Sequence, residues 1–340
     1  LNIALIVLKV PLWKNIPEAI AQVCAELKVQ TVHANIELGV NELKRDFDLQ
    51  YLLEKKNISV ELYHDRTLFP LATIRNKSDL PYKVFGAFKK NCYERLSISL
   101  PTCYPKPEKQ NSPYQIKNFS QVVPSFEALM GRDSFCSSAE LWSVTEQHAV
   151  KLLDDFIKNK MRTYQTLRDF PNLDGTSQLS TYLNIGILSI RQCIQALFRE
   201  QQGHFHIDHE GQQIWLDELL WREFYQHILF DFPQVSKHLP FKENTLKLAW
   251  IEDSTALNAW QMGQTGIPIV DAGIRQMLAT GWMHNRVRMI VASFLTKHLL
   301  IDWRWGEAYF AKKLLDFDLA ANNGGWQWAA GCGCDAAPYF

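Results

Sequence analysis

The stretch Asn-Asn-Gly-Gly-Trp-Gln-Trp-Ala-Ala, residues 322–330, places two amides, two glycines and two tryptophans side by side near the end of the chain. Paired glycines let the backbone approach a neighbouring group closely or turn sharply. Tryptophans at alternate positions are costly to expose unless a flat ring or a pocket covers them. A buried aromatic corner of a helical core is the simpler alternative. Both interpretations place these rings against a buried surface.

The composition is that of a globular protein without net charge. The chain has 340 residues, enough for two domains and a large core. Apolar residues make up 47%, which is an ordinary value. Lysine plus arginine and aspartate plus glutamate number 36 each, so any nucleic-acid binding must come from a local basic patch. The 11 tryptophans fit a protein that holds a flat cofactor, although aromatic richness is usually just core.

The seven cysteines are scattered and form no Cys-x-x-Cys pair, so we expect neither a zinc site nor a disulfide framework. Reduced cysteines suit a cytoplasmic protein. No apolar run reaches membrane-spanning length, and Ile3–Val10 has no basic leader before it. We therefore expect neither a membrane protein nor a signal peptide. Because the chain begins with leucine, we expect it to be a fragment that starts inside a domain.

Residues 1–66 alternate between strand and helix patterns. The β-branched run Ile3–Val10 is typical of a buried parallel strand, and Thr31–Ile36 and Ile58–Tyr63 predict two more. Helical patterns lie between them, at Ile16–Leu27 and Asn41–Leu53. Strands joined by short helices predict a doubly wound parallel sheet. Such a sheet needs about five or six strands, so we expect this α/β domain to be N-terminally incomplete.

Residues 67–136 are rich in proline, serine and asparagine and predict an inter-domain connection with one helix at Tyr82–Leu96. Residues 137–340 are helical almost throughout. The clearest helices are Ala139–Lys160, Ser189–Glu200, Trp215–Phe230, Pro268–Thr280, Asn285–Leu300 and Glu307–Leu315. The predicted fold class is therefore α/β followed by all-α.

Residues 174–180, Asp-Gly-Thr-Ser-Gln-Leu-Ser, place small hydroxyls and backbone N–H groups before a helix. The pattern is compatible with an anion cradle. An ordinary Ser/Thr turn with a helix N-cap fits it better when the segment is taken alone. The chain contains neither Gly-x-Gly-x-x-Gly nor a P-loop motif, so a nucleotide would be held by some other device.

Residues 215–225 combine two tryptophans with a carboxylate and a guanidinium. In a helix Trp215, Glu218 and Arg222 share one face, and Trp221 lies three residues beyond Glu218. Glu218 and Arg222 could form a plain surface pair worth roughly a few tenths of a kcal/mol. Two tryptophans around a carboxylate favour a pocket wall instead, with Trp221 stacking on a base and Glu218 donating or accepting a proton.

Residues 281–289 read Gly-Trp-Met-His-Asn-Arg-Val-Arg-Met. In a helix Asn285 and Met289 align, with Arg286 and Arg288 on neighbouring faces. A capped helix with a basic flank explains the pattern, since methionine is more often core filler than a ligand contact. His284 alone does not predict catalysis.

Two aspartates and two asparagines occur in the otherwise apolar residues 314–323. Buried carboxylates must be paired, and Arg288 is a candidate partner for Asp316. Asp316 and Asp318 lack the further carboxylates of a metal centre, so we expect no metal.

In order and spacing, these segments resemble the DNA photolyase/cryptochrome family, most closely its class I cyclobutane pyrimidine dimer photolyases. The similarity is close over residues 168–340 and looser before them. Trp-Met-His-Asn-Arg-Val-Arg-Met and Asp-Leu-Ala-Ala-Asn-Asn-Gly-Gly-Trp-Gln-Trp are its most specific signatures. The family continues past the final Tyr-Phe with an arginine-rich tail, so the resemblance implies that the helical domain is C-terminally incomplete.

The resemblance implies non-covalent FAD, folded into a U shape in the helical domain and active in its reduced form. Asn322 matches the position that faces the redox-active ring nitrogen, and Arg288 matches the ion-pair partner of Asp316. Gln178 stands where an arginine is often found. The implied cofactor contacts are Tyr164, Thr176, Ser177, Gln178, Leu179, Ser180, Trp215, Arg288, Asp316, Phe317, Asp318 and Asn322.

Further residues match other sites of the family. The implied lesion and DNA contacts are Glu218, Trp221, Arg222, Tyr225, Asn285, Arg286, Met289 and Trp328. Glu218 and Asn322 are implied in catalysis, together with Trp250, Trp303 and Trp326, which match the tryptophan chain that re-reduces the flavin. Asn41, Glu42 and Lys237 match contacts to an antenna chromophore, implied to be methenyltetrahydrofolate.

The implied activity is that of a deoxyribodipyrimidine photo-lyase, a carbon–carbon lyase. Reduced FAD would absorb blue light and give an electron to a dimer flipped out of the duplex, as photolyases are known to do. DNA with pyrimidine dimers is the expected partner, and we expect a monomer. The alternative is a cryptochrome-type blue-light photoreceptor without repair activity. A helical interaction domain without a cofactor is a more distant one.

Overall fold

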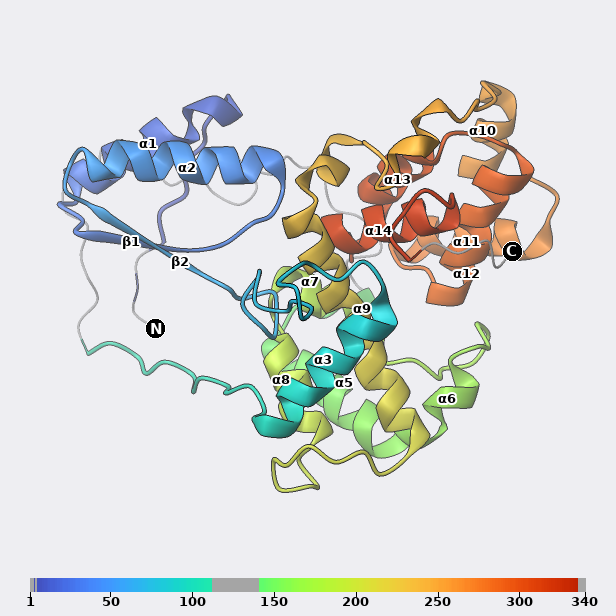
Figure 1. Cartoon of the computed structure of the whole chain (residues 1–340), viewed down its shortest axis with the longest axis horizontal. Helices are drawn as coiled ribbons and strands as arrows, with labels where there is room; N and C mark the ends of the chain where they lie inside the picture. Colours follow the sequence, from blue (N-terminus) through green and yellow to red (C-terminus); the bar gives the residue numbers. More distant parts are fainter. Residues whose placement is uncertain (1–2, 4, 112–140, 336–340) are drawn as a thin grey trace. The chain divides into compact units, whose positions relative to one another are not determined.

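The computed structural model describes residues 3, 5–111 and 141–335 (Figure 1). The described chain forms two compact units. One contains residues up to 65 together with 103–111, and the other contains residues 66–102 and 141–335. Among the helices in these ranges, none combines the length and apolar character that a membrane crossing requires.

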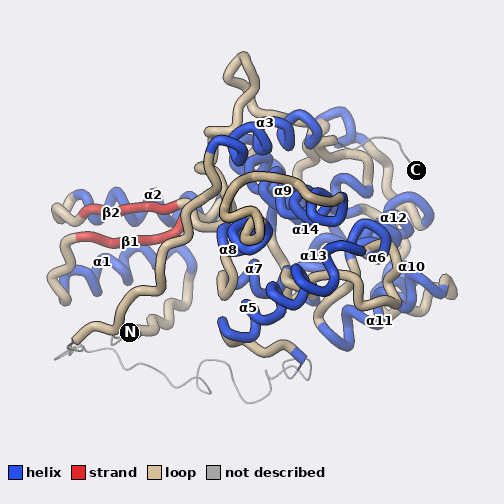
Figure 2. Tube along the Cα trace, turned by 90° about the horizontal axis from the view of Figure 1, so that it is seen from below, coloured by secondary structure: helices blue, strands red, loops and turns tan. Residues whose placement is uncertain are grey.

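The smaller unit is built on a two-stranded parallel sheet, drawn red in Figure 2. Strands β1 (Thr31–Asn35) and β2 (Ser59–Tyr63) pair with Thr31 opposite Ser59. Helices α1 (Ile16–Glu26) and α2 (Val40–Glu54) lie on the same face of the sheet (Figure 1), and η1 (Trp13–Asn15) precedes α1. The sheet therefore confirms the α/β character predicted for this part of the chain. Its small core consists of Ala21, Cys24, Leu49, Leu53 and Ile58.

The first of the three predicted strands is wrong. Ile3 and residues 5–10 have no regular secondary structure. Leu5 is 79% exposed, and in the described part of the chain β1 pairs with β2 alone. An apolar run becomes a strand only where a neighbouring strand satisfies its backbone groups, and the described residues provide no such neighbour for it. The two strands that were predicted on either side of α2 are confirmed to within one residue.

The larger unit is helical. Its elements are α3 (Phe85–Ile98), α5 (Glu146–Asp155), η3 (Phe156–Lys160), η4 (Met161–Thr163), α6 (Tyr164–Leu167), α7 (Ser180–Ile185), α8 (Ile190–Leu197), α9 (Glu210–Asp231), η5 (Pro233–Lys237), η6 (Glu243–Lys247), α10 (Ser254–Gln261), α11 (Pro268–Thr280), α12 (Asn285–Ser293), η7 (Phe294–His298), α13 (Trp303–Lys313) and α14 (Leu319–Ala329).

Helix boundaries follow capping residues more than apolar periodicity. The helix expected at Ala139–Lys160 begins only at Glu146, because the Thr145 hydroxyl accepts the His148 N–H; residues 139–140 lie outside the described chain. The helix expected at Glu307–Leu315 begins earlier, at Trp303, since Asp302 caps it by accepting the Arg304 N–H. Helix α11 has the predicted bounds, with Pro268 in its first turn.

Residues 66–102 group with the helical unit, although their composition predicts a connection. Helix α3 buries Phe85, Phe88, Cys92 and Leu96 in the same core as α9. The proline-rich composition predicts a connection, but it does not reveal that the helix inside the segment buries enough apolar residues to join a core. The domain boundaries expected from composition remain a proposal.

The two glycines of residues 322–330 lie inside α14, so the sharp turn is wrong and the close approach is confirmed. A β-carbon on Gly324 would overlap the ring of Tyr225 on α9. Similarly, a β-carbon on Gly306 of α13 would overlap the ring of Trp326 on α14. Helix α14 therefore packs closely against both α9 and α13, which belong to two separate hydrophobic clusters.

Candidate functional site

A cavity of about 410 Å³ lies among α9, α12, the end of α13 and α14. Its volume is within the usual range of ligand pockets. The lining residues are Arg168, Glu218, Trp221, Arg222, Tyr225, Asn285, Arg286, Arg288, Met289, Ala292, Phe310, Leu314, Asp316, Phe317, Asp318, Ala321, Asn322, Gly325, Trp326 and Trp328.

Trp221 forms a fixed aromatic wall of the cavity. Its ring stacks on Phe85 of α3, with 3.7 Å between the ring centroids and 13° between the planes. Tyr225, one turn later on α9, lies 5.7 Å from the Trp221 ring. Stacking on Phe85 and contact with Tyr225 limit rotation of the indole, so Trp221 offers a preformed flat surface to a ligand.

Glu218 pairs with a residue that the helical spacing could not indicate. Its Oε1 lies 2.5 Å from Nη1 of Arg168, whereas Arg222 donates to the backbone oxygen of Arg66 at 2.6 Å. The surface pair between Glu218 and Arg222 is therefore wrong. Trp215, the other tryptophan expected beside Glu218 in the pocket wall, is instead buried against Phe156, with 5.0 Å between the centroids, outside the cavity lining.

The predicted pair of Arg288 and Asp316 is confirmed. Nη2 of Arg288 lies 2.7 and 3.0 Å from the two carboxylate oxygens, and its Nε donates to the backbone oxygen of Met283 at 2.8 Å. The Asp316 side chain is 3% exposed. A buried carboxylate held in this way places a fixed ion pair in the cavity wall.

The start of α12 is a capped helix with a basic flank, as predicted. Nδ1 of His284 accepts the Arg286 N–H at 3.2 Å. Burial lowers the pKa of His284, and Arg286 and Arg288 lower it further, which favours the neutral ring that can accept this hydrogen bond. Nε of Arg286 lies 2.6 Å from the Asp169 carboxylate.

Asp318 has a structural role that the sequence did not indicate. It caps α14 by accepting the Ala321 N–H at 2.9 Å, and it also accepts from Gln226 at 2.8 Å and Arg66 at 3.2 Å. These bonds tie α9 and residue 66 to the start of α14.

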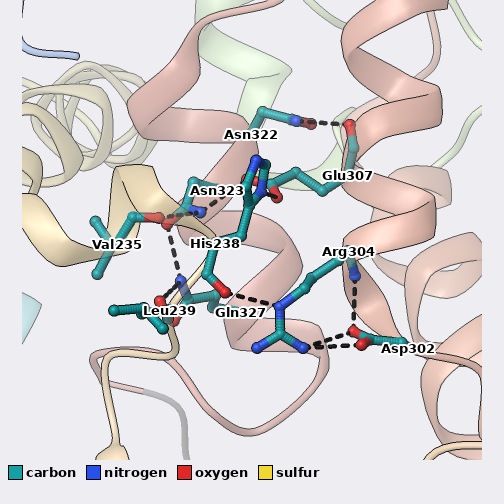
Figure 3. Close-up of polar contacts among 9 residues, drawn as sticks. All are labelled: Val235, His238, Leu239, Asp302, Arg304, Glu307, Asn322, Asn323 and Gln327. Atoms are coloured by element: carbon teal, nitrogen blue, oxygen red, sulfur yellow. Dashed lines mark hydrogen bonds and ion pairs between the residues drawn. The ribbon is translucent and has the colours of Figure 1, made fainter. Parts of the chain in front are cut away.

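The side-chain amide of Asn322 is hydrogen-bonded to the backbone of α13. Its Nδ2 donates to the backbone oxygen of Glu307 at 3.1 Å (Figure 3). Nearby, Trp326 is buried against Trp260, with 6.0 Å between centroids, and against Phe310, with 5.0 Å. Its Nε1 is buried and has no hydrogen-bond partner within the described chain.

The cavity lining contains all of the predicted DNA and lesion contacts and some of the predicted cofactor contacts. Every residue predicted to contact DNA or the lesion lines it, as do Arg288, Asp316, Phe317, Asp318 and Asn322 of the predicted cofactor set. Trp326 lines it too, whereas Trp303 is buried and Trp250 half-buried outside the lining. The predicted cofactor contacts outside the lining are Tyr164, Thr176, Ser177, Gln178, Leu179, Ser180 and Trp215.

Residues 174–180 do not form the predicted N-cap. Helix α7 begins at Ser180, and its N-cap residue, Leu179, makes no side-chain hydrogen bond. Gln178 has a φ of 52°, a backbone conformation that non-glycine residues rarely adopt. The loop before α7 therefore has an unusual backbone conformation at Gln178, and the anion cradle remains a prediction.

The predicted antenna contacts lie in different units. Asn41 and Glu42 are in the first turn of α2, and Lys237 ends η5. Their role stays a prediction.

Phe85, Asp169 and Gly325 contribute to the site although the sequence did not single them out for it. Gly325 is the most informative, because nothing lies within 4 Å of a β-carbon built on it. As a lining residue it keeps space open that any other side chain would fill. Its place beside the tryptophan pair was visible in the sequence, but its facing direction was not.

The cavity wall fits a flat, polar heteroaromatic group such as the flavin ring. Gly325 leaves room, aromatic rings supply flat surfaces, and Arg288 and Asn322 supply polar contacts. The buried Nε1 of Trp326, which has no hydrogen-bond partner in the described residues, can donate to such a group. By contrast, no group of three or more His, Cys, Asp or Glu side chains in the described residues is arranged to hold a metal.

Comparison with known proteins agrees with this geometry. Residues 1–108 match the family profile described as DNA photolyase, and residues 215–340 match the profile described as the FAD binding domain of DNA photolyase. The chain is 43% identical over 323 residues to the deoxyribodipyrimidine photo-lyase of Escherichia coli, covering 95% of this chain and 66% of that protein.

The similarity extends to a second relative and to a solved structure. The chain is 40% identical over 343 residues to the deoxyribodipyrimidine photo-lyase of Vibrio cholerae, covering 100% of this chain and 71% of that protein. A bacterial class III photolyase from Agrobacterium tumefaciens superposes with a TM-score of 0.82 at 33% identity, covering 95% of this chain and 66% of the other.

An α/β unit together with a helical unit that holds a charged and aromatic cavity is the architecture of a two-domain flavoprotein. The chain belongs to the DNA photolyase family. It spans 64% to 71% of the length of the first curated relatives that it matches.

Proposed function

We propose that the protein is a light-driven lyase that splits cyclobutane pyrimidine dimers in DNA by electron transfer from reduced FAD to a flipped-out lesion. The observation that carries the proposal is the cavity, which brings Trp221, Met289 and Trp328 together with Asn322 and the Arg288–Asp316 pair. When bound, reduced FAD supplies the light absorption and the electron.

On the cofactor side, the chain supplies a polar and rigid wall. The Arg288 guanidinium is fixed by Asp316 and by the Met283 carbonyl, so it presents a positive charge without reorganisation. Asn322 presents an amide whose nitrogen end is already bonded. The guanidinium would favour a reduced, negatively charged ring over an oxidised one, and the amide oxygen would accept a hydrogen bond from a ring N–H.

On the lesion side, Trp221 and Trp328 would take up the two bases between aromatic surfaces, with Met289 packed against them. Glu218 would hydrogen-bond a base edge, and its bond to Arg168 keeps the carboxylate in place. A dimer leaves the duplex at lower cost than an intact pair because it is already poorly stacked.

The arginines that line the cavity would position the DNA backbone. The Arg286 side chain is 32% exposed, and Asp169 holds its guanidinium. Contacts between arginine and the phosphate backbone carry no sequence information. They release counterions, so binding should weaken as salt rises.

Other parts of the proposal rest on family likeness. Trp326, Trp303 and Trp250 would return electrons to the flavin, and Tyr164, Trp215 and residues 176–180 would hold the rest of FAD. Asn41, Glu42 and Lys237 would contact methenyltetrahydrofolate as antenna. The protein would act as a cytoplasmic monomer without a metal.

The test is an absorption spectrum followed by a repair assay. Purified protein should be yellow or blue from bound flavin and should restore ultraviolet-irradiated oligonucleotides under blue light, but not in the dark. A coloured protein that never repairs would favour a cryptochrome-type photoreceptor. Colourless protein after reconstitution with FAD would contradict the proposal altogether.

A further inference from the structure

Asp169 lies between two of the arginines that line the cavity. Its Oδ1 is 2.6 Å from Nε of Arg286 and 3.8 Å from Nε of Arg168. Through Nη1, Arg168 also pairs with Glu218 at 2.5 Å. Four side chains of alternating charge therefore run from α9 through residues 168–169 to α12.

The backbone holds the Asp169 carboxylate in this place. Asp169 lies in the turn that follows α6, where the Arg168 N–H donates to the carbonyl of Tyr164 at 3.1 Å. Tyr164 is 8% exposed, so the turn starts from a buried residue. The Asp169 side chain itself is 53% exposed. A fixed backbone thus presents this carboxylate to solvent beside Arg286.

A carboxylate and a phosphate compete for the same guanidinium, because arginine binds either anion through two parallel N–H groups. Such a pair of N–H groups includes either Nε or Nη1. In Arg286, Nη1 lies 3.7 Å from Sδ of Met289, which lines the cavity. The edge left for a backbone phosphate is therefore the Nε edge, and Asp169 occupies it.

The contact between Asp169 and Arg286 is weak enough to be exchanged. Both side chains are partly exposed, 53% and 32%. Exposed pairs of this kind change an equilibrium constant by no more than about fivefold. A DNA phosphate belongs to a line of closely spaced negative charges, which attracts arginine more strongly than a single carboxylate does. The phosphate can therefore take the place of the carboxylate.

The buried carboxylates of the cavity wall cannot compete in this way. The side chains of Asp316 and Asp318 are 3% and 8% exposed, and each pairs with its own arginine. Asp169 differs from them because it lies outside the cavity lining and reaches solvent, from which a DNA strand arrives.

We propose that Asp169 competes with the DNA phosphates for Arg286 and thereby lowers the affinity of the protein for DNA. The inference rests on the proposed function in one respect, namely that a DNA strand lies over Arg286. When a phosphate binds, the guanidinium changes its partner from the carboxylate to the phosphate. Damaged and intact DNA meet the same competition, so both affinities are lowered by the same factor. Weak binding of intact and repaired strands lets the protein leave them and search for further dimers.

Asp169→Asn keeps the size of the side chain and removes its charge. It should bind damaged and intact duplexes about 2- to 5-fold more tightly than the parent. The logarithm of the binding constant should also fall more steeply with the logarithm of salt concentration, by about 0.9 for one additional phosphate contact. Fluorescence anisotropy over a series of salt concentrations measures both. The matched control is Asp154→Asn, because Asp154 pairs with Arg199 at 3.0 Å, outside the cavity lining.

A double-mutant cycle separates competition for Arg286 from simple repulsion of the DNA. In the Arg286→Gln background, Asp169→Asn should lose most of its effect, since it no longer releases this guanidinium. A gain in affinity as large in that background as in the parent would show that Asp169 acts by repulsion alone, and the proposal would fail. An Asp169→Asn protein that binds DNA as the parent does, or more weakly, also overturns it.

A second readout needs neither repair nor DNA. Inorganic phosphate is titrated into purified protein with isotope-labelled arginine, and the Nε resonance of Arg286, assigned with Arg286→Gln, is followed by NMR. Phosphate should shift this resonance at lower concentration in Asp169→Asn than in the parent. If the parent binds no DNA, the proposed function fails, while this titration still decides whether Asp169 competes with phosphate. Equal midpoints in the two proteins reject the competition.

Discussion

Gly324 of α14 lies so close to the ring of Tyr225 on α9 that a β-carbon would overlap it, whereas the neighbouring Gly325 faces open space in the cavity wall. The two adjacent positions therefore require glycine for different physical reasons. One permits helix packing, and the other keeps a volume empty.

We expect Gly324→Ala to lower the free energy of unfolding by about 1–3 kcal/mol, because overpacking forces α9 and α14 apart. Gly325→Leu should keep or slightly raise stability, since glycine in a helix costs about 1 kcal/mol relative to alanine, but it should reduce flavin content by filling the cavity. Denaturant unfolding and flavin absorbance per protein separate the two effects. Equal flavin content in Gly325→Leu and the parent would show that the cavity is not the flavin site.

The ion pair of Arg288 with Asp316 should be the costliest polar contact to break in the cavity wall. Asp316→Asn leaves a largely buried guanidinium without its counter-charge, which costs about 3–5 kcal/mol. Asp154→Asn is the control, since Asp154 pairs with Arg199 on the surface of the same unit, and such pairs contribute about 0–1 kcal/mol. Equal losses in the two variants, measured by denaturant unfolding, would contradict this account.

Trp221→Ala should weaken binding of dimer-containing DNA roughly 10- to 100-fold, from the loss of about 1–3 kcal/mol of base stacking. Flavin content should not change, because the proposed function places the Trp221 ring against the lesion and not against the flavin. Fluorescence anisotropy with damaged and intact duplexes measures the discrimination. Trp305→Ala is the control, since Trp305 is 60% exposed and outside the cavity lining; a parallel loss in both variants would remove Trp221 from the lesion site.

Asn322→Asp should make the reduced anionic flavin harder to form. A carboxylate cannot donate to the Glu307 carbonyl as Nδ2 does, and its negative charge opposes a negatively charged ring. The flavin reduction potential should therefore move to more negative values. Asn159→Asp, at an exposed side chain bonded to Asp155, should leave it unaltered. Identical potentials in Asn322→Asp and the parent would exclude Asn322 from contact with the ring.

Stability should fall with rising pH through Glu307. Burial raises its pKa above the ordinary value of 4.5, so above that value the folded protein keeps a proton that the unfolded chain has released. The contribution is fully present below the ordinary value and is lost as pH rises through the folded pKa. Glu307→Gln should remove this slope from a plot of unfolding free energy against pH. A slope of the same size in Glu307→Gln would assign it to another group.

Much of the helical unit could be predicted because its signals are local. Helix α11 is bounded by Pro268 and by Gly281, which ends it in a left-handed conformation, and both residues are visible in the sequence. The pair of Arg288 and Asp316 could be predicted as well, since a carboxylate in an apolar segment needs a cation.

Other features depended on distant parts of the chain. Ile3–Val10 has the composition of a strand but no partner in the described residues. Glu218 pairs with Arg168 and not with Arg222 four residues along, because the fold brings residue 168 into the cavity lining. Phe85 supports Trp221 from a segment whose prolines indicate a connection.

The sequence alone determined which residue types surround the cavity and which family they match, because those signatures are short and contiguous. Only the tertiary structure decided that Gly324 packs against Tyr225 while Gly325 leaves space in the cavity. It also decided that Asn322 and Asn323 both donate hydrogen bonds to Glu307. The reason is physical: helical periodicity fixes which side chains share a face, but the neighbour of that face is chosen by how the helices pack.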